Sequence, residues 1–117
     1  MPGLSVHVVD IARGVPAAGM RVEIWSRDGA PSMLAEGAVA TNGVAALGDL
    51  ATRSLAVGQY EAVFHVATWY RAQGVALPAV PYLDRVGYAF GISDSAQHYH
   101  LPFKVSPWGY SLFRGGA

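Results

Sequence analysis

The chain is divided into short stretches of alternating apolar and polar residues, and this pattern limits its possible folds more than any other feature. Near the N-terminus, Leu4, Val6 and Val8 alternate with their neighbours, so one face of an expected β-strand is apolar. Turn residues separate the stretches. Asn42-Gly43, for example, tolerates the positive φ angles that a two-residue hairpin requires. The sequence therefore predicts an all-β sandwich.

The segments with the alternation typical of strands are residues 4–9, 20–25, 33–40, 59–66, 85–92, 98–105 and 109–114. Residues 44–57 are less regular, and the whole pattern indicates about eight strands. One short helix is expected over residues 68–73, with Thr68 as its N-cap and Gly74 at its end. A chain of 117 residues can bury one core but not two, so we expect a single domain over residues 1–117.

Composition argues against several classes of function. Eight basic and eight acidic residues cancel, and no basic cluster is present, so neither nucleic acid nor an anionic membrane is the expected partner. The absence of cysteine excludes disulfides and thiolate catalysis. No signal-peptide pattern and no apolar run of about 20 residues is found, so we expect a cytoplasmic location. A hydrophobic content of 52% suggests that self-association covers part of the surface.

Two histidines stand one residue apart in the run Gln97-His98-Tyr99-His100. If this segment is a strand, His98 and His100 project from the same face. Two imidazoles on one face can carry out acid–base chemistry, bind a metal ion, or have neither role. The function of the chain depends on which of these applies.

Several motifs follow one another in the order and at the spacings of the transthyretin-like proteins. They are residues 4–10 and 14–17 near the N-terminus, the turn at 41–43, the strand entry at 58–60, and the runs at 98–102 and 110–115. Over nearly its whole length the chain resembles this family. It looks closer to the 5-hydroxyisourate hydrolases than to the thyroid-hormone carriers, which lack the histidines. The resemblance implies a transthyretin-like (prealbumin) sandwich of two four-stranded sheets. It also implies a homotetramer with active sites in the channel between dimers, and hydrolytic opening of an oxidised purine ring without an organic cofactor.

The resemblance also assigns the candidate catalytic residues. His7 matches the catalytic histidine of the family's first strand, and His100 matches the histidine of its penultimate strand. His98 is the companion of His100 and is expected to orient or assist it. Three imidazoles would suffice for a zinc ion with an open position. Because this spacing is not diagnostic and no acidic second shell can be recognised, we expect no metal site.

Other positions depart from the family pattern. Val44 stands where the family's catalytic arginine follows the turn, Phe113 stands where tyrosine is usual, and Gly116 replaces a serine, whereas Arg114 is kept. Ser111 is expected to share the channel face with His100. We therefore expect Val44, Ser111, Phe113 and Arg114 to contact the substrate.

These changes favour an enzyme that resembles the hydroxyisourate hydrolases but has a remodelled pocket. Its histidine pair would act on a small cyclic substrate other than 5-hydroxyisourate, in a specialised biosynthetic pathway. Loss of the arginine removes a donor for a substrate oxyanion, which favours a less polar ligand. Two alternatives remain. One is a genuine 5-hydroxyisourate hydrolase of urate catabolism in which Arg53 or Arg85 replaces the arginine. The other is a non-catalytic small-molecule carrier of the transthyretin type.

Three further residues are expected to have structural roles. Asp10 should shape the first turn. His65 should be a partly exposed strand residue, and Tyr110 should face the interior of the sandwich.

Overall fold

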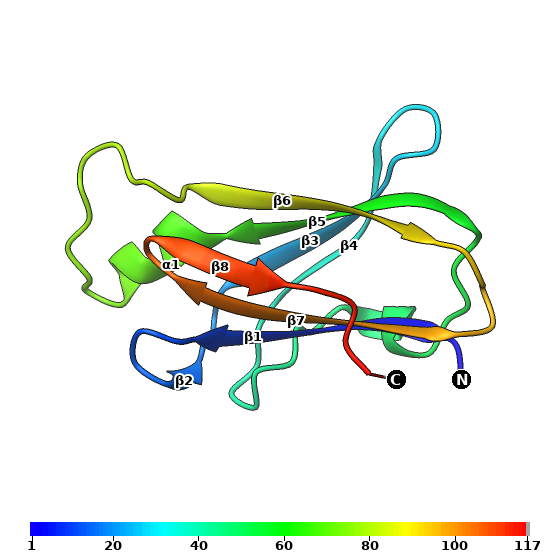
Figure 1. Ribbon diagram of the computed structural model, residues 1–117, viewed down its shortest axis with the longest axis horizontal. Helices are drawn as coiled ribbons and strands as arrows, with labels where there is room; N and C mark the ends of the chain where they lie inside the picture. Colours follow the sequence, from blue (N-terminus) through cyan, green and yellow to red (C-terminus); the bar gives the residue numbers. More distant parts are fainter. Residues whose placement is uncertain (117) are drawn as a thin grey trace.

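The computed structural model describes residues 1–116 as a sandwich of two four-stranded sheets, which confirms the predicted fold class (Figure 1). The first sheet has the order β2 (Val15–Pro16), β1 (Gly3–Asp10), β7 (His98–Ser106) and β8 (Gly109–Leu112). The second has the order β4 (Ser32–Ala38), β3 (Arg21–Ser26), β5 (Gly58–His65) and β6 (Arg85–Ile92). A 3-10 helix, η1 (Gly48–Ala51), and one α-helix, α1 (Val66–Ala72), complete the fold. Among residues 1–116, no helix is both long and apolar enough to span a bilayer.

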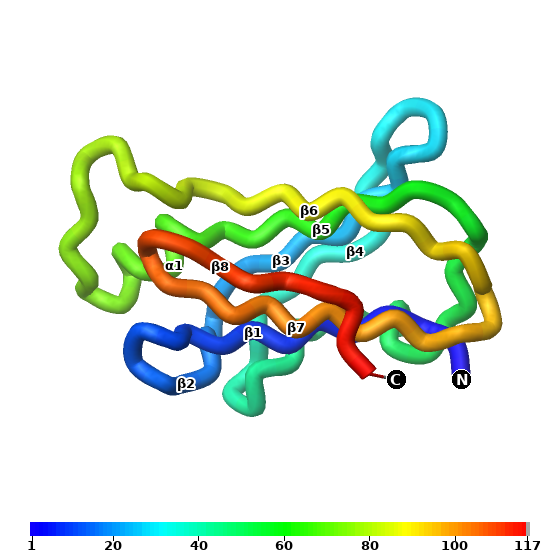
Figure 2. The backbone as a smooth tube through the Cα atoms, viewed as in Figure 1, coloured from blue at the N-terminus to red at the C-terminus, as the bar shows by residue number. Residues whose placement is uncertain are grey.

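The first and seventh strands run parallel, although they lie at opposite ends of the sequence. Their register pairs Ser5 with His100 and His7 with Pro102. The neighbouring β8 is antiparallel to β7, and the chain beyond it turns back toward the N-terminus (Figure 2). This pairing brings residues from both ends of the chain to one sheet.

The core lies between the two sheets and is built by the alternation seen in the sequence. Leu4, Val6 and Val8 of β1 are fully buried. Phe64 of β5 stacks on Phe103 of β7 with ring centroids 4.0 Å apart, which joins the two sheets at the centre of the sandwich. Because the inward residues are held in this way, the residues between them must face outward.

The helix differs from its prediction at the start and agrees at the end. It begins at Val66, two residues before Thr68, and no side chain caps it. The backbone N–H groups of Val66 and Ala67 instead donate to the carbonyl of Asp84, at 3.1 and 3.0 Å. A carbonyl from a distant part of the chain thus satisfies the first turn. Gly74, with a φ of 78°, follows the helix as expected.

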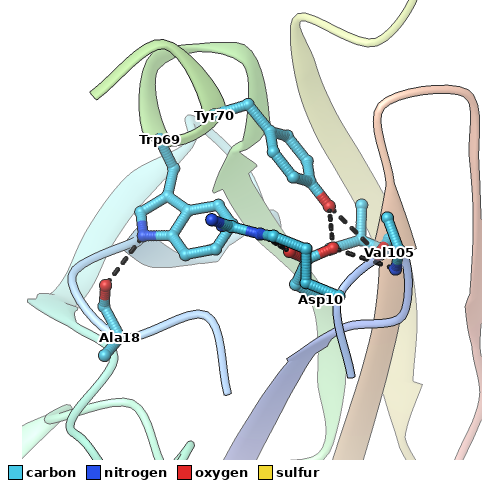
Figure 3. A network of polar contacts seen from close by, with 7 residues as sticks. Asp10, Ala18, Trp69, Tyr70 and Val105 are labelled. Atoms are coloured by element: carbon cyan, nitrogen blue, oxygen red, sulfur yellow. Dashed lines mark hydrogen bonds and ion pairs between the residues drawn. The ribbon is translucent and has the colours of Figure 1, made fainter. Parts of the chain in front are cut away.

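A buried polar network closes one end of the sandwich (Figure 3). The carboxylate of Asp10 is fully buried and accepts hydrogen bonds from the Tyr70 hydroxyl at 2.7 Å, the Ala12 N–H at 3.1 Å and the Arg13 Nε–H at 2.8 Å. The Tyr70 hydroxyl also lies 3.1 Å from the Val105 carbonyl. Burial alone would raise the pKa of Asp10, but the bonds from Arg13, Tyr70 and Ala12 outweigh it and hold the pKa below 3.8. The predicted role of Asp10 in the first turn is confirmed.

Candidate active site

The histidines lie on the outward face of the sheet that contains β1, β7 and β8. In β7, Tyr99 and Leu101 are buried in the core, whereas His98 and His100 alternate with them and are partly exposed. Ser5 and His7 project from the same face of the adjacent β1. The parallel register of β1 and β7 sets His100 opposite Ser5 and His7 opposite Pro102, so His7 and His100 are offset along neighbouring strands rather than directly opposite each other.

Ser5 joins the two histidines of β7. Its Oγ lies 2.8 Å from Nε2 of His98 and 2.6 Å from Nδ1 of His100. Nothing in the sequence alone marks Ser5 as part of the site. The alternation of β1 places Ser5 on the same face as His7, but only the register shows that it stands between two imidazoles.

The hydrogen bonds assign the tautomers of the neutral imidazoles. Nδ1 of His98 lies 3.2 Å from the Pro2 carbonyl, which can only accept, so this nitrogen carries the proton. Nε2 of His98 then accepts from the Ser5 hydroxyl, and the Ser5 oxygen accepts from Nδ1–H of His100. The remaining nitrogen of His100, Nε2, is therefore unprotonated and free to accept a proton.

Electrostatics favour this neutral state of His100. Partial burial is the largest cause, and the nearby His7 and His98 contribute next. Together they lower the pKa of His100 below the ordinary value of 6.5. At neutral pH, His100 therefore has the form required of a base.

His7 is held by the turn that precedes Val44. Its Nε2 donates to the Asn42 carbonyl at 3.2 Å, which leaves Nδ1 of the neutral ring unprotonated. Gly43 has a φ of 89°, and a Cβ at this position would lie 2.5 Å from Nε2 of His7. A side chain at position 43 would displace His7. Val44 forms an isolated antiparallel bridge with His7, which places the two side chains on the same face.

Arg114 lies at one end of the histidine face. Its Nη2 donates to Oε1 of Gln97 at 2.9 Å and to the carbonyl of His98 at 3.3 Å, and its guanidinium lies 3.9 Å from the Tyr99 ring centroid. A pocket of about 650 Å³ opens here, and its lining residues are Met1, Ala51, Ala96, Gln97, His98 and Arg114. The N–H of Gly115 donates to the His100 carbonyl at 2.7 Å, which anchors the tail beside the site.

Lys104 lies at the other end of this face, on the same side of β7 as the histidines. Its Nζ is 5.6 Å from the ring centroid of Phe113, and β8 places Ser111 opposite Lys104. Ser111 and Phe113 thus lie on the outward face, as expected. Tyr110 points the other way and contacts Phe103 with ring centroids 5.5 Å apart. It nevertheless remains 47% exposed, so the prediction that it faces the interior of the sandwich is only partly met, because β8 lies at the edge of its sheet.

Neither arginine considered as a replacement at position 44 belongs to this face of the chain. Arg85 is in β6 of the opposite sheet. Arg53 lines a separate pocket with Tyr60.

Within residues 1–116, no cluster of three or more histidine or acidic side chains is arranged as a metal site. The fourth histidine, His65, is partly exposed on the second sheet and pairs with Glu23 at 2.6 Å.

The architecture and this outward histidine cluster define the chain as a two-sheet β-sandwich with a surface site built on its first sheet. The model of the HIUase/Transthyretin family matches residues 4–115. The chain belongs to this family, as the resemblance predicted.

Relatives of known name span the whole chain. A 5-hydroxyisourate hydrolase of Caulobacter vibrioides is 41% identical over 116 residues, which are 98% of this chain and 99% of the relative. The structure of the 5-hydroxyisourate hydrolase of Klebsiella pneumoniae has a TM-score of 0.80 and 31% identity, covering 99% of this chain and 100% of that one. A crystal structure of (S)-allantoin synthase has a TM-score of 0.86 and 30% identity. It is matched over 97% of this chain, which spans only 43% of that protein.

Proposed function

We propose that the chain is a 5-hydroxyisourate hydrolase that opens its cyclic substrate by acid–base catalysis at His100 and His7. The observation that carries the proposal is the Ser5-linked histidine pair, which leaves Nε2 of His100 free as a base. Relatives that bear this name and span the full chain support it. They favour this alternative over the different substrate that we preferred from the sequence.

The chemistry follows from the protonation states of the two histidines. His100 takes a proton from water at Nε2 while the water oxygen bonds to a ring carbonyl carbon. The bond between that carbon and the ring nitrogen then breaks, and His7 delivers a proton to the leaving nitrogen, which requires that His7 take up a second proton, at Nδ1, before this step. His98 assists His100 through Ser5, and no organic cofactor or metal takes part in these steps.

Charge on the histidine face supports an anionic substrate. Lys104 and Arg114 flank the site, and none of the outward side chains of β1, β7 and β8 is a carboxylate. We assign the substrate anion to these cations in place of the arginine that Val44 replaces. Ser111 and Phe113 complete the wall beside Lys104.

Self-association would enclose this open face. Trp108 is 62% exposed and Phe113 is 44% exposed, so large apolar side chains of the first sheet face solvent in one chain. We assign the chain to a homotetramer in which the histidine faces of two dimers line a central channel. Each small-molecule site would then lie between subunits.

The apolar residues Val44 and Phe113 favour a second candidate, an acid–base enzyme for a neutral cyclic substrate. Val44 lies beside His7 and cannot hold an anion, and the Phe113 ring has no hydroxyl to donate. This candidate keeps the same histidines and predicts that removing the positive charge of Lys104 does not weaken substrate binding.

The direct test is the decay of freshly generated 5-hydroxyisourate, followed by ultraviolet absorbance. We expect the purified protein to accelerate the decay at catalytic concentration, with a kcat in the ordinary enzymatic range of about 1–10³ s⁻¹. Heat-denatured protein is the blank. A decay no faster than the blank would overturn the proposal and leave the neutral-substrate candidate.

Replacing Lys104 by methionine tests the charge assignment. Methionine keeps an apolar stem but cannot bind an anion. We expect KM for 5-hydroxyisourate to rise about 10-fold or more, since a hydrogen bond to a charged group contributes about 1.5–3 kcal/mol. Lys104→Arg should keep KM within a few fold, and Arg85→Met, on the opposite sheet, is the matched control. An unchanged KM in Lys104→Met would contradict the assignment.

A further inference from the structure

The arrangement of Ser5 between His98 and His100 does more than hold the two rings. The serine oxygen is within 2.8 Å of one imidazole nitrogen and 2.6 Å of the other, and it has one proton to donate. It must therefore donate to one ring and accept from the other. The direction of these two bonds decides which nitrogen of His100 carries a proton.

We propose that Ser5 is a proton relay, so that the proton accepted by His100 during catalysis is stored as positive charge on His98. The relay extends the proposed function, because it takes His100 as the base. It gives His98 a role of its own, as the residue that holds the positive charge.

The relay balances in protons and charge. Nε2 of His100 takes a proton from water while Nδ1–H of His100 passes its proton to Oγ of Ser5. The hydroxyl proton of Ser5 passes to Nε2 of His98. His100 ends neutral with its proton on Nε2, Ser5 is again a hydroxyl, and His98 is an imidazolium. The hydroxide equivalent released from water is the nucleophile that bonds to the carbonyl carbon.

His98 is built to hold this charge. Its Nδ1–H already points to the Pro2 carbonyl at 3.2 Å, and its new Nε2–H would point to Oγ of Ser5. Both N–H groups of the imidazolium are therefore paired with oxygen atoms. In His100 only Nδ1 is paired with an oxygen atom, because its Nε2 has no hydrogen-bond partner within residues 1–116.

Among residues 1–116, no carboxylate pairs with either ring, so an ion pair fixes the proton on neither His98 nor His100. The other titratable or charged groups that face the pair are His7 from β1, Lys104 on β7, Arg114 of the tail and Met1, and the last two line the pocket beside His98. Burial and the neighbouring histidines lower the pKa of His100. Moving the proton to His98 places it where oxygen atoms accept both N–H groups.

The relay predicts a specific result in a long-range ¹H–¹⁵N NMR titration of the histidines. Near neutral pH, His100 should be in the Nδ1–H form. As His98 becomes protonated on acidification, His100 should change to the Nε2–H form while staying neutral. In Ser5→Ala this tautomer change should disappear, and in Ser5→Thr, which keeps the hydroxyl, it should persist. Ser32→Ala, an exposed serine of β4, is the matched control.

Kinetics provide the second readout. Ser5→Ala should lower kcat about 10-fold or more with KM changed by less than about 3-fold, and Ser5→Thr should recover most of the loss. Independent titration of His98 and His100 in the unmodified protein, or an Nε2–H form of His100 at neutral pH, would overturn the relay. These spectra decide the relay even if Ser5→Ala does not fold. The 5-hydroxyisourate assay separately decides the proposed function.

Discussion

Replacing His100 by alanine is expected to lower kcat/KM by about 10²–10⁴-fold, the usual contribution of a general base. The loss should fall on kcat, because His100 acts on the attacking water and the cations hold the substrate. His65→Gln is the matched control, since that histidine lies on the second sheet and pairs with Glu23. Steady-state kinetics with 5-hydroxyisourate measure both variants. Activity of His100→Ala within a few fold of the unmodified protein would show that His100 is not the base.

The pH dependence of the same reaction gives an independent check on His100. A base must be neutral to accept a proton, and the pKa of His100 is lowered by burial and then by His7 and His98. The acid limb of kcat/KM should therefore fall below pH 6.5, with activity retained above it and lost as the pH drops and the Ser5-linked pair takes up a proton that leaves Nε2 of His100 occupied. A limb centred above 6.5 would assign the essential base to another group.

Replacing Asp10 by alanine is expected to lower the free energy of unfolding by about 3 kcal/mol, because a fully buried carboxylate holds three donors together. The Tyr70 hydroxyl and the Ala12 N–H would lose their acceptor, and Arg13 would lose its partner. Urea denaturation followed by tryptophan fluorescence measures the change. Tyr70→Phe, which removes one of these bonds, should cost less, and a cost equal to that of Asp10→Ala would contradict a shared network.

The stability that Asp10 provides should depend on pH. Its folded-state pKa is lower than the ordinary value of 3.8, so its contribution is complete above that value. The contribution is lost as the pH falls through the folded-state pKa and the carboxylate is protonated. Between pH 5 and pH 2, the free energy of unfolding of Asp10→Ala should therefore change less than that of the unmodified protein.

Much of the fold could be predicted because it follows from local patterns. Alternation identified the strands and the buried side of β1, and it placed His98 and His100 together on the outward side of β7. Turn residues marked Gly43 and Gly74 correctly. The start of α1 could not be predicted, because the carbonyl of Asp84, far along the chain, satisfies its first N–H groups.

The candidate site could be predicted only in part. The histidines were found by their types and by the family resemblance, but their partner was not. In the sequence, Ser5 resembles any other strand serine. Only the parallel register of β1 and β7 shows that it lies opposite His100. Lys104 likewise can be assigned to the site only from the structure, which places it over the Phe113 ring on the face that holds the histidines.

The sequence by itself determined which residues are buried, which turns are tight, and which family the chain resembles, because these depend on residue type and local spacing. The tertiary structure alone decided how β1 and β7 are paired, since no local pattern specifies the register of two strands more than 80 residues apart. That register creates the link from His98 through Ser5 to His100, and it places Arg114 and Lys104 at the two ends of the same face. The acid–base chemistry proposed for this protein depends on that arrangement.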